Sequence, residues 1–131
     1  SAQISTGFKT NHTRWQKFEW DDDDTYCVIA PKAPVDIAIE GITLRHCVKS
    51  YIQSVALGNT NIVFIRRKEQ TEDPFFTVEV DNFNNIRQIH GMCNSNVDTV
   101  SGLADFVKRW CKQKKLKYNA QHANVARAVR Y

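Results

Sequence analysis

Four side chains suited to acid–base chemistry lie in three segments of the sequence: His46 and Tyr51 in the first, Glu79 in the second and His90 in the third. A histidine, a glutamate and an arginine around a phosphodiester can supply a base, an acid and charge stabilisation without a metal ion. We predict that these four candidate catalytic residues, with Gln88 and an arginine, form a polar pocket at one end of a β-sheet. The structural alternative is that His46 caps its helix or bridges to a neighbouring strand.

The arginine of this pocket would be Arg66 or Arg67, which end a predicted strand. Successive side chains of a strand point to opposite faces of the sheet, so each face receives one of the two. One guanidinium is therefore expected beside Glu79 on the adjacent strand, where a cross-strand ion pair is the simpler interpretation. In the functional interpretation, both arginines belong to a nucleic-acid-binding set.

A zinc site is a further possibility, built from His46, Cys47, His90 and Cys93. The H-x-x-C spacing of His90 and Cys93 is compatible with zinc ligation. Neighbours on a regular helix point about 100° apart, so His46 and Cys47 cannot readily share one ion. The pattern is also less specific than paired C-x-x-C motifs. We therefore expect no cofactor, and we interpret the cysteines as buried thiols in a reducing compartment, with Cys47 in the core.

The sequence becomes strongly basic after Asp105, with eight lysines and arginines and no acidic residue. Lysine and arginine neutralise phosphates, and exposed aromatic rings can stack on bases. We expect Trp110 in the core and Tyr118 as an exposed stacking platform. The alternative is an ordinary solvated face. The basic residues are Lys108, Arg109, Lys112, Lys114, Lys115, Lys117, Arg127 and Arg130.

The composition limits the class of protein. A chain of 131 residues, 42% hydrophobic and 24% charged, is expected to form one folded domain. No apolar stretch approaches the roughly 20 residues of a membrane span, and no secretory leader opens the chain. We therefore expect a cytoplasmic protein. The acidic run at residues 21–24 is expected to be a solvated turn that could pair with the basic tail.

The elements that would position these side chains follow from periodicity and turn residues. We expect a short strand near residues 25–31, a segment from Pro34 that Gly41 closes, and a long helix over residues 43–57 capped by Thr43. Three strands follow at 61–67, 74–80 and 85–92, then a helix capped by Asp98 or Ser101, and more helix at 120–129. This order predicts an α+β fold: a small antiparallel sheet of three or more strands, with helices packed on one face.

The segment EGITLRHCVKSY, residues 40–51, resembles the signature of the PcfJ-like proteins, and the resemblance continues through IVFIRRK, PFFTVEV and IRQIHGMCN. His90 stands where relatives carry an arginine before the glycine of the third strand. The resemblance covers residues 34–112, with residues 1–33 as a lead-in and 113–131 as a basic helical tail of a single domain. Because PcfJ-like proteins are associated with conjugative plasmids and phages, the resemblance implies a mobile-element protein.

Three hypotheses of function follow. The first is a domain that binds or processes DNA or RNA, with the basic tail on the phosphate backbone and the polar edge of RHCVKSY facing the ligand. The second is a catalytic domain, a metal-independent nuclease or a transferase, centred on His46, Tyr51 and Glu79. The third is a protein-interaction module of a conjugation or phage complex, docking through the acidic run or the basic tail.

Overall fold

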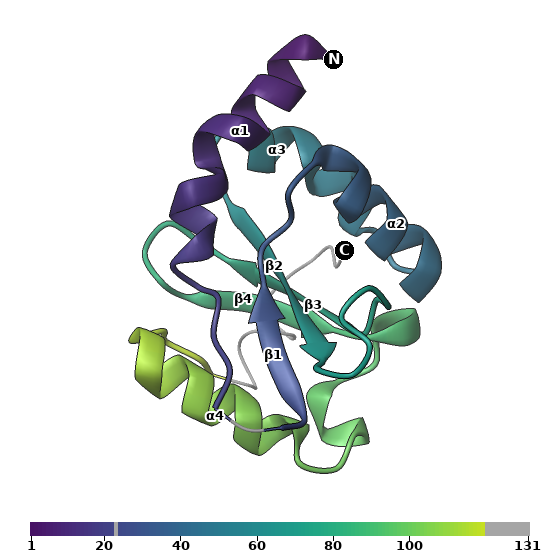
Figure 1. Ribbon diagram of the computed structural model, residues 1–131, viewed down its shortest axis with the longest axis vertical. Coiled ribbons are helices and arrows are strands. Elements are labelled where there is room, and N and C mark those ends of the chain that lie inside the picture. Colours follow the sequence, from purple (N-terminus) through teal and green to yellow (C-terminus); the bar gives the residue numbers. More distant parts are fainter. Residues whose placement is uncertain (23, 120–131) are drawn as a thin grey trace.

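The computed structural model describes residues 1–22 and 24–119, which form a four-stranded sheet with helices around it (Figure 1). The strands follow one another in the order β1-β2-β3-β4, and each neighbouring pair is antiparallel. The predicted α+β class and antiparallel meander are confirmed. In chain order the helices and strands are α1 (Ala2–Gln16), β1 (Tyr26–Ile29), α2 (Pro34–Leu44), α3 (Ile52–Ala56), β2 (Asn61–Arg67), β3 (Phe76–Val80), β4 (Ile86–His90) and α4 (Leu103–Lys114).

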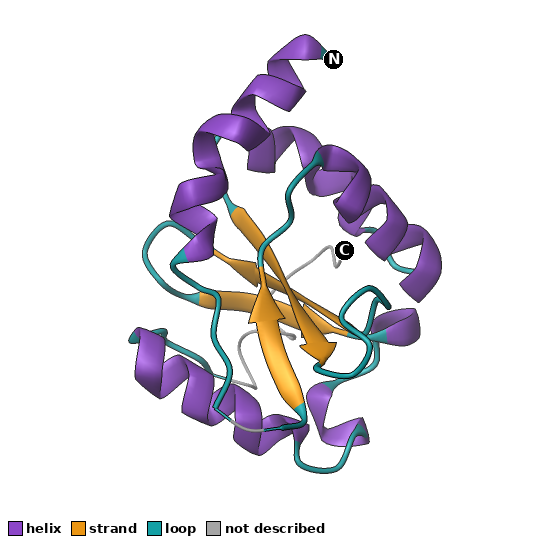
Figure 2. Ribbon diagram, in the orientation of Figure 1, coloured by secondary structure: helices purple, strands orange, loops and turns teal. Residues whose placement is uncertain are grey.

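Helices cover both faces of the sheet rather than the single face that we expected (Figure 2). Val63 and Ile65 of β2 pack toward α4, in a core that includes Trp110. Ile62 and Phe64 of the same strand pack in a second core, with residues of α1, α2 and α3. The reason is visible in β2, which is apolar on both faces over most of its length and therefore needs cover on both sides.

The first segment of the chain, which the sequence analysis treated only as a lead-in, is a helix that its aromatic residues anchor to the domain. Phe8 and Trp15 of α1 are buried and meet edge to face, with ring centroids 5.1 Å apart. Trp15 Nε1 donates a hydrogen bond to Asn61 Oδ1 at 3.0 Å, so the helix is tied to the start of β2. Gly7 lies directly against the backbone of Ala56, which leaves no room for a Cβ between α1 and α3.

The predicted continuous helix over residues 43–57 is wrong. Helix α2 runs through Gly41 and ends at Leu44, because Arg45 adopts a left-handed conformation with φ 55°. A 3-10 helix, η1 (Val48–Tyr51), and the short α3 follow. Thr43 lies inside α2 and caps nothing. Gly41 permits the break, since a Cβ there would lie 3.2 Å from His46 O and 3.2 Å from Lys49 N.

Helix α4 confirms the helix predicted after the third strand, but it begins later than expected. The expected caps are wrong: Asp98 lies in a separate 3-10 helix, η3 (Val97–Thr99), and Ser101 precedes the actual N-cap, Gly102. The helix ends at Lys115, which is left-handed, and the backbone of Lys117 then bonds to the start of β4. The predicted helix over residues 120–129 lies outside the described residues. No helix of the described part has the length and apolar content that a membrane span requires.

Candidate functional site

The side of β3 and β4 that faces α2, η1 and α3 carries a strip of buried polar side chains. Thr77 and Glu79 come from β3, and Gln88 and His90 from β4, and each is at most 3% exposed. The register places Thr77 opposite His90 and Glu79 opposite Gln88. Because residues two apart in a strand share a face, the four form one continuous polar strip beneath the helices.

An ion pair joins α2 to this strip. Arg66 Nη2 and Nη1 donate to the two carboxylate oxygens of Glu40, at 2.6 and 3.1 Å. Thr77 Oγ1 donates to Glu40 Oε2 at 2.8 Å, and Arg66 Nε donates to the carbonyl of Thr71. Burial raises the pKa of the Glu40 carboxyl, while Arg66 and Thr77 oppose that rise. Glu40 thus fixes α2 against the sheet, because its buried carboxylate accepts three hydrogen bonds, two from Arg66 and one from Thr77.

His46 continues this network from the segment between α2 and η1. Its Nε2 lies 2.9 Å from Thr77 Oγ1. Thr77 has one O–H and gives it to Glu40, so His46 Nε2 must carry the proton and donate. Nδ1 is then the acceptor, and the Val48 N–H lies 3.4 Å from it. Burial, with a smaller contribution from nearby His90, lowers the pKa of His46 to about 4, so the ring is neutral at neutral pH.

A second network lies along the same face. Thr60 Oγ1 donates to Glu79 Oε2 at 2.8 Å, and Gln88 Nε2 donates to Glu79 Oε1 at 2.9 Å. Gln88 Nε2 also lies 3.2 Å from the Tyr51 hydroxyl. Tyr51 thereby links η1 to β4, and Glu79 accepts from Thr60, which precedes β2, and from Gln88 of β4.

The structure thus places His46, Tyr51, Glu79 and His90 on one side of the sheet, in and above its polar strip. His46, Tyr51 and Glu79 take part in hydrogen-bonded networks and His90 is fully buried opposite Thr77, instead of forming the open polar pocket that we predicted, because α2, η1 and α3 cover the strip. Arg66 belongs to the same face but pairs with Glu40, so the expected pair with Glu79 is wrong. Arg67 points elsewhere and is exposed, with its guanidinium 3.8 Å from the Phe75 ring centroid.

Glu40 is the residue of this site that sequence reasoning missed. It is fully buried, yet it was noted only as part of a signature segment. Its burial could have been inferred from its position in α2 among Ile37, Gly41 and Leu44, which form the buried stripe of that helix. A carboxylate on an apolar stripe needs a buried cation, and the end of β2 supplied two candidates.

The cysteines divide into two kinds. Cys27 and Cys111 are buried, whereas Cys47 and Cys93 are exposed, so the prediction of four buried thiols is wrong for the latter two. Cys47 is exposed because the chain breaks at Arg45 and turns His46 inward in its place. Burial raises the pKa of the Cys111 thiol to about 12. Within residues 1–22 and 24–119, no group of three or more His, Cys, Asp or Glu side chains is placed to hold a metal ion.

The basic residues near the end of the described chain lie mainly on the solvent side of α4. Lys108 and Lys112 are exposed there, and Lys115 and Lys117 are exposed just beyond the helix. Lys114 is half-buried. Arg109 Nε pairs with Asp22 Oδ2 at 2.7 Å, so the acidic run does contact the basic segment.

Tyr118 is not the exposed platform that we expected. Its side chain is half-buried and packs against the core beneath α4, which also buries Leu116. This desolvation raises the pKa of the Tyr118 hydroxyl. Trp110 is fully buried, as predicted, and its Nε1 donates to the carbonyl of Phe18 at 2.8 Å.

Comparison with known proteins agrees with the signature at residues 40–51, which supplies Glu40, His46 and Tyr51 to the networks. The sequence model of the PcfJ-like protein family matches residues 5–101. The chain belongs to the PcfJ-like family. The matched region of this PcfJ-like protein includes most of α1, together with α2, α3 and all four strands.

An uncharacterized protein of Listeria innocua is a relative, 32% identical over 96 residues. The aligned part is 72% of this chain and 20% of the relative. The PcfJ-like chain therefore spans about a fifth of the length of the curated relative that it matches. No solved structure matches the chain.

Proposed function

We propose that this PcfJ-like protein is a nucleic-acid-binding domain, and that the basic face of α4 holds the phosphate backbone of DNA or RNA. The observation that carries the proposal is the division of α4 into two faces. Phe106, Val107 and Trp110 are buried in the core, whereas Lys108 and Lys112 are exposed on the opposite side. An exposed lysine stripe on a rigid helix is suited to neutralising successive phosphates.

The stripe extends beyond the helix. Lys108, Lys112 and Lys115 are spaced by four and three residues, which places them on one side of the helix and its end. Lys117 follows where the backbone bonds to β4. Among the described basic residues of this segment, Arg109 alone takes part in an ion pair, which leaves the lysines available to an anionic ligand.

The arrangement around His46 favours binding over cleavage. A general base needs a ring nitrogen that can reach the proton of the attacking group. Both ring nitrogens of His46 are already engaged, one with Thr77 and the other with the Val48 N–H, and the residue is buried. We therefore assign the networks of His46 and Glu79 a structural role that supports the domain.

The PcfJ-like signature supports placing this binding domain in a protein of a mobile genetic element, acting in the bacterial cytoplasm. The polyanion in that setting would be plasmid or phage DNA, or RNA made from it. Lysine contacts to phosphates do not by themselves distinguish the two.

The proposal is tested by titrating the protein against labelled single-stranded and double-stranded DNA and RNA, at about 50 mM and about 200 mM salt. The same samples are then examined for cleavage products. We expect binding that weakens steeply with salt and leaves the nucleic acid intact. Absence of binding at the lower salt concentration contradicts the proposal. Cleavage of the nucleic acid also contradicts it and supports the catalytic hypothesis instead.

A further inference from the structure

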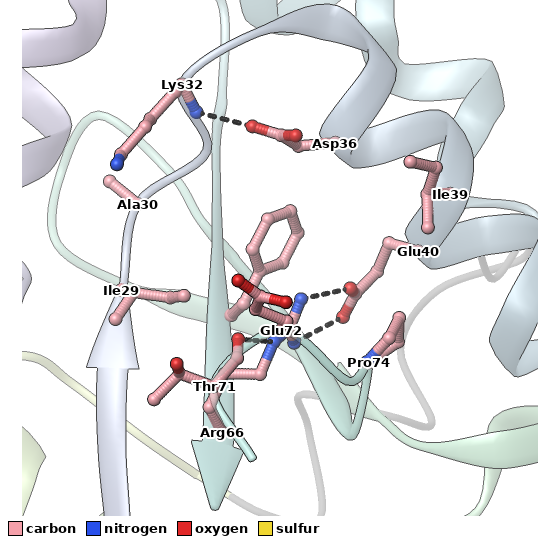
Figure 3. A pocket seen from close by; sticks show the side chains of 11 residues that line it. Ile29, Ala30, Lys32, Asp36, Ile39, Glu40, Arg66, Thr71, Glu72 and Pro74 are labelled. Carbon is pink, nitrogen blue, oxygen red and sulfur yellow. Dashed lines mark hydrogen bonds and ion pairs between the residues drawn. The ribbon is translucent and has the colours of Figure 1, made fainter. Parts of the chain in front are cut away.

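A pocket of about 270 Å³ opens between α2, the end of β1 and residues 71–74 (Figure 3). The Arg66–Glu40 ion pair lies at its base. The space is roughly that of one long side chain or a small molecule, at the lower end of ligand pockets. Much of the lining is apolar, from Ile29, Ala30, Ile39, Phe64 and Pro74.

The charges that remain free in this pocket are mainly negative. Arg66 and Glu40 neutralise each other at its base, which leaves the carboxylates of Asp36 and Glu72 against Lys32. Asp36 Oδ2 accepts from the backbone N–H groups of Lys32 and Ala33, and its Oδ1 has no hydrogen bond within the described residues. The Lys32 side chain extends away from Asp36 (Figure 3). The pocket therefore suits a cationic group.

The guanidinium of Arg66, which lines this pocket, is buried and keeps one N–H group unused within the described residues. Of the five N–H groups of a guanidinium, Arg66 directs one to Thr71 O, one to Ile65 O and two to Glu40. The fifth, on Nη2, has no acceptor within the described residues. Because Glu40 already neutralises the guanidinium, a neutral carbonyl oxygen is the acceptor that this N–H suits best.

An apolar ridge runs along the solvent side of α2 and continues into the pocket wall. Val35, Ile39 and Ile42 are 57, 49 and 69% exposed, and their spacing of four and three residues aligns them. Ile39 belongs to both the ridge and the pocket. The opposite side of α2 already packs in the core, through Ile37 and Leu44. A contiguous exposed apolar stripe of this kind is typical of a protein contact.

We propose that the α2 ridge and this pocket together form a docking site for a polypeptide segment of a partner protein. The segment carries apolar side chains that cover Val35 and Ile42, and one arginine or lysine that enters the pocket. The aliphatic stem of the basic side chain packs on Ile39, and its charged end reaches Asp36 and Glu72. A backbone carbonyl of the segment accepts the fifth N–H of Arg66.

Charge complementarity is the reason for choosing a basic segment as the occupant. The ridge alone would accept any apolar surface, but the surplus carboxylates of the pocket penalise a neutral or acidic side chain. The docking site lies on the side of the sheet opposite α4. Loss of nucleic-acid binding would therefore leave this inference intact, and the two sites can be tested separately.

The first test uses a blocked peptide of leucine and alanine with one central arginine, and a matched peptide with citrulline in place of the arginine. Citrulline keeps the shape of arginine and removes the charge. Binding to the full ¹⁵N-labelled chain is followed by amide chemical shifts. We expect the arginine peptide to shift the amides of Ile39, Thr71 and Glu72, and to bind at least about tenfold more tightly than the citrulline peptide.

Two matched pairs of variants locate the contact. Glu72→Gln should weaken the arginine peptide about two- to fivefold, whereas Glu69→Gln, an exposed carboxylate outside the pocket, should not. Ile42→Ala should weaken the peptide, whereas Leu57→Ala should not, although Leu57 is similarly exposed at 67%. All four positions are exposed or at the rim, so the variants are expected to fold.

Three outcomes overturn the proposal. Equal binding of the arginine and citrulline peptides removes the role of the pocket carboxylates. Binding of blocked arginine alone as tightly as the peptide assigns the pocket to a small basic molecule. Self-association in sedimentation that Ile42→Ala abolishes assigns the ridge to a second copy of this chain.

Discussion

The carboxylate of Glu40 and the guanidinium of Arg66 form a doubly hydrogen-bonded ion pair across 26 residues of sequence, with both side chains buried. Glu40 comes from α2 and Arg66 from the end of β2, so the pair joins a helix to the sheet. The same carboxylate accepts from Thr77 of β3, and through Thr77 the contact reaches His46. One buried charge pair thus helps to position α2 and the segment that carries His46 over the polar strip.

Removing one partner of this pair should be costly. Glu40→Leu or Arg66→Met alone leaves a buried charge without its counter-ion, and we expect each to lower the free energy of unfolding by about 3–5 kcal/mol. The double variant replaces the pair by apolar side chains and should be more stable than either single variant. Urea unfolding of the unchanged protein, the two single variants and the double variant gives the free energies for a double-mutant cycle. Strictly additive losses would contradict the coupling of the two charges.

Acid should destabilise the fold through His46. Burial lowers its pKa from 6.5 to about 4, so above pH 6.5 the residue is neutral in both the folded and unfolded chain. Between pH 6.5 and 4 the unfolded chain binds a proton that the folded chain does not, and stability falls as pH falls. The loss is about 3 kcal/mol over this interval, and below pH 4 it does not grow further.

The variant His46→Gln should flatten this part of the pH profile, because glutamine does not titrate. Glu40 is present in both proteins, so its own titration enters both profiles. His12→Gln, at a histidine outside the network, serves as the control and should keep the slope. Chemical unfolding at several pH values between 4 and 7.5 gives the comparison, and an unchanged slope in His46→Gln would contradict the assignment.

Gly7→Ala should destabilise the protein even though alanine favours a helix. Within α1 the replacement alone would stabilise by about 1 kcal/mol. The added Cβ, however, meets the backbone of Ala56, so α1 and α3 must separate, at a cost of about 2–3 kcal/mol. Thr13→Ala, at an exposed position of the same helix, should change stability by less than about 0.5 kcal/mol. Thermal unfolding distinguishes the two, and a more stable Gly7→Ala protein would show that the close approach of the helices is not rigid.

Neutralising the lysine stripe of α4 should reduce the salt dependence of nucleic-acid binding. Each lysine that contacts a phosphate adds about 1 to the slope of log affinity against log salt. The double variant Lys108→Ala, Lys112→Ala should lower that slope by about 2. The matched control Lys9→Ala, Lys49→Ala removes the same charge from exposed positions outside α4. If the two double variants had equal effects, binding would depend on the net charge of the protein and not on the lysines of α4.

Much of the sheet could be predicted from the sequence, because alternate residues of a strand point to opposite faces of the sheet. Asn61–Arg67 is the predicted strand, and Phe76, Val78 and Val80 share the predicted face. The buried stripe of α4 was equally clear, since Leu103, Phe106, Val107 and Trp110 repeat at helical spacing. These features depend only on the spacing of apolar residues within one segment, which is visible in the sequence.

The arrangement of α2, η1 and α3 over the polar strip could not be predicted in this way. Residues 43–57 have the apolar spacing of one helix, yet the chain breaks at Arg45, because Gly41 lets the following turn approach and His46 gains a buried partner in Thr77. Contacts between distant segments outweigh the small helix propensities of a few residues. For the same reason the sequence indicated Glu79 as the partner of one of the two arginines, whereas Arg66 pairs with Glu40.

The sequence by itself determined the antiparallel sheet, the apolar stripe of α4 and part of the polar set on one side of the sheet, which includes His46, Glu79 and His90. The tertiary structure alone decided that helices cover both faces, that the polar side chains are buried in networks, and that Glu40 is the counter-ion of Arg66. The physical reason is that periodicity encodes which side of an element is buried, whereas the partner of a buried charge depends on how separate elements pack.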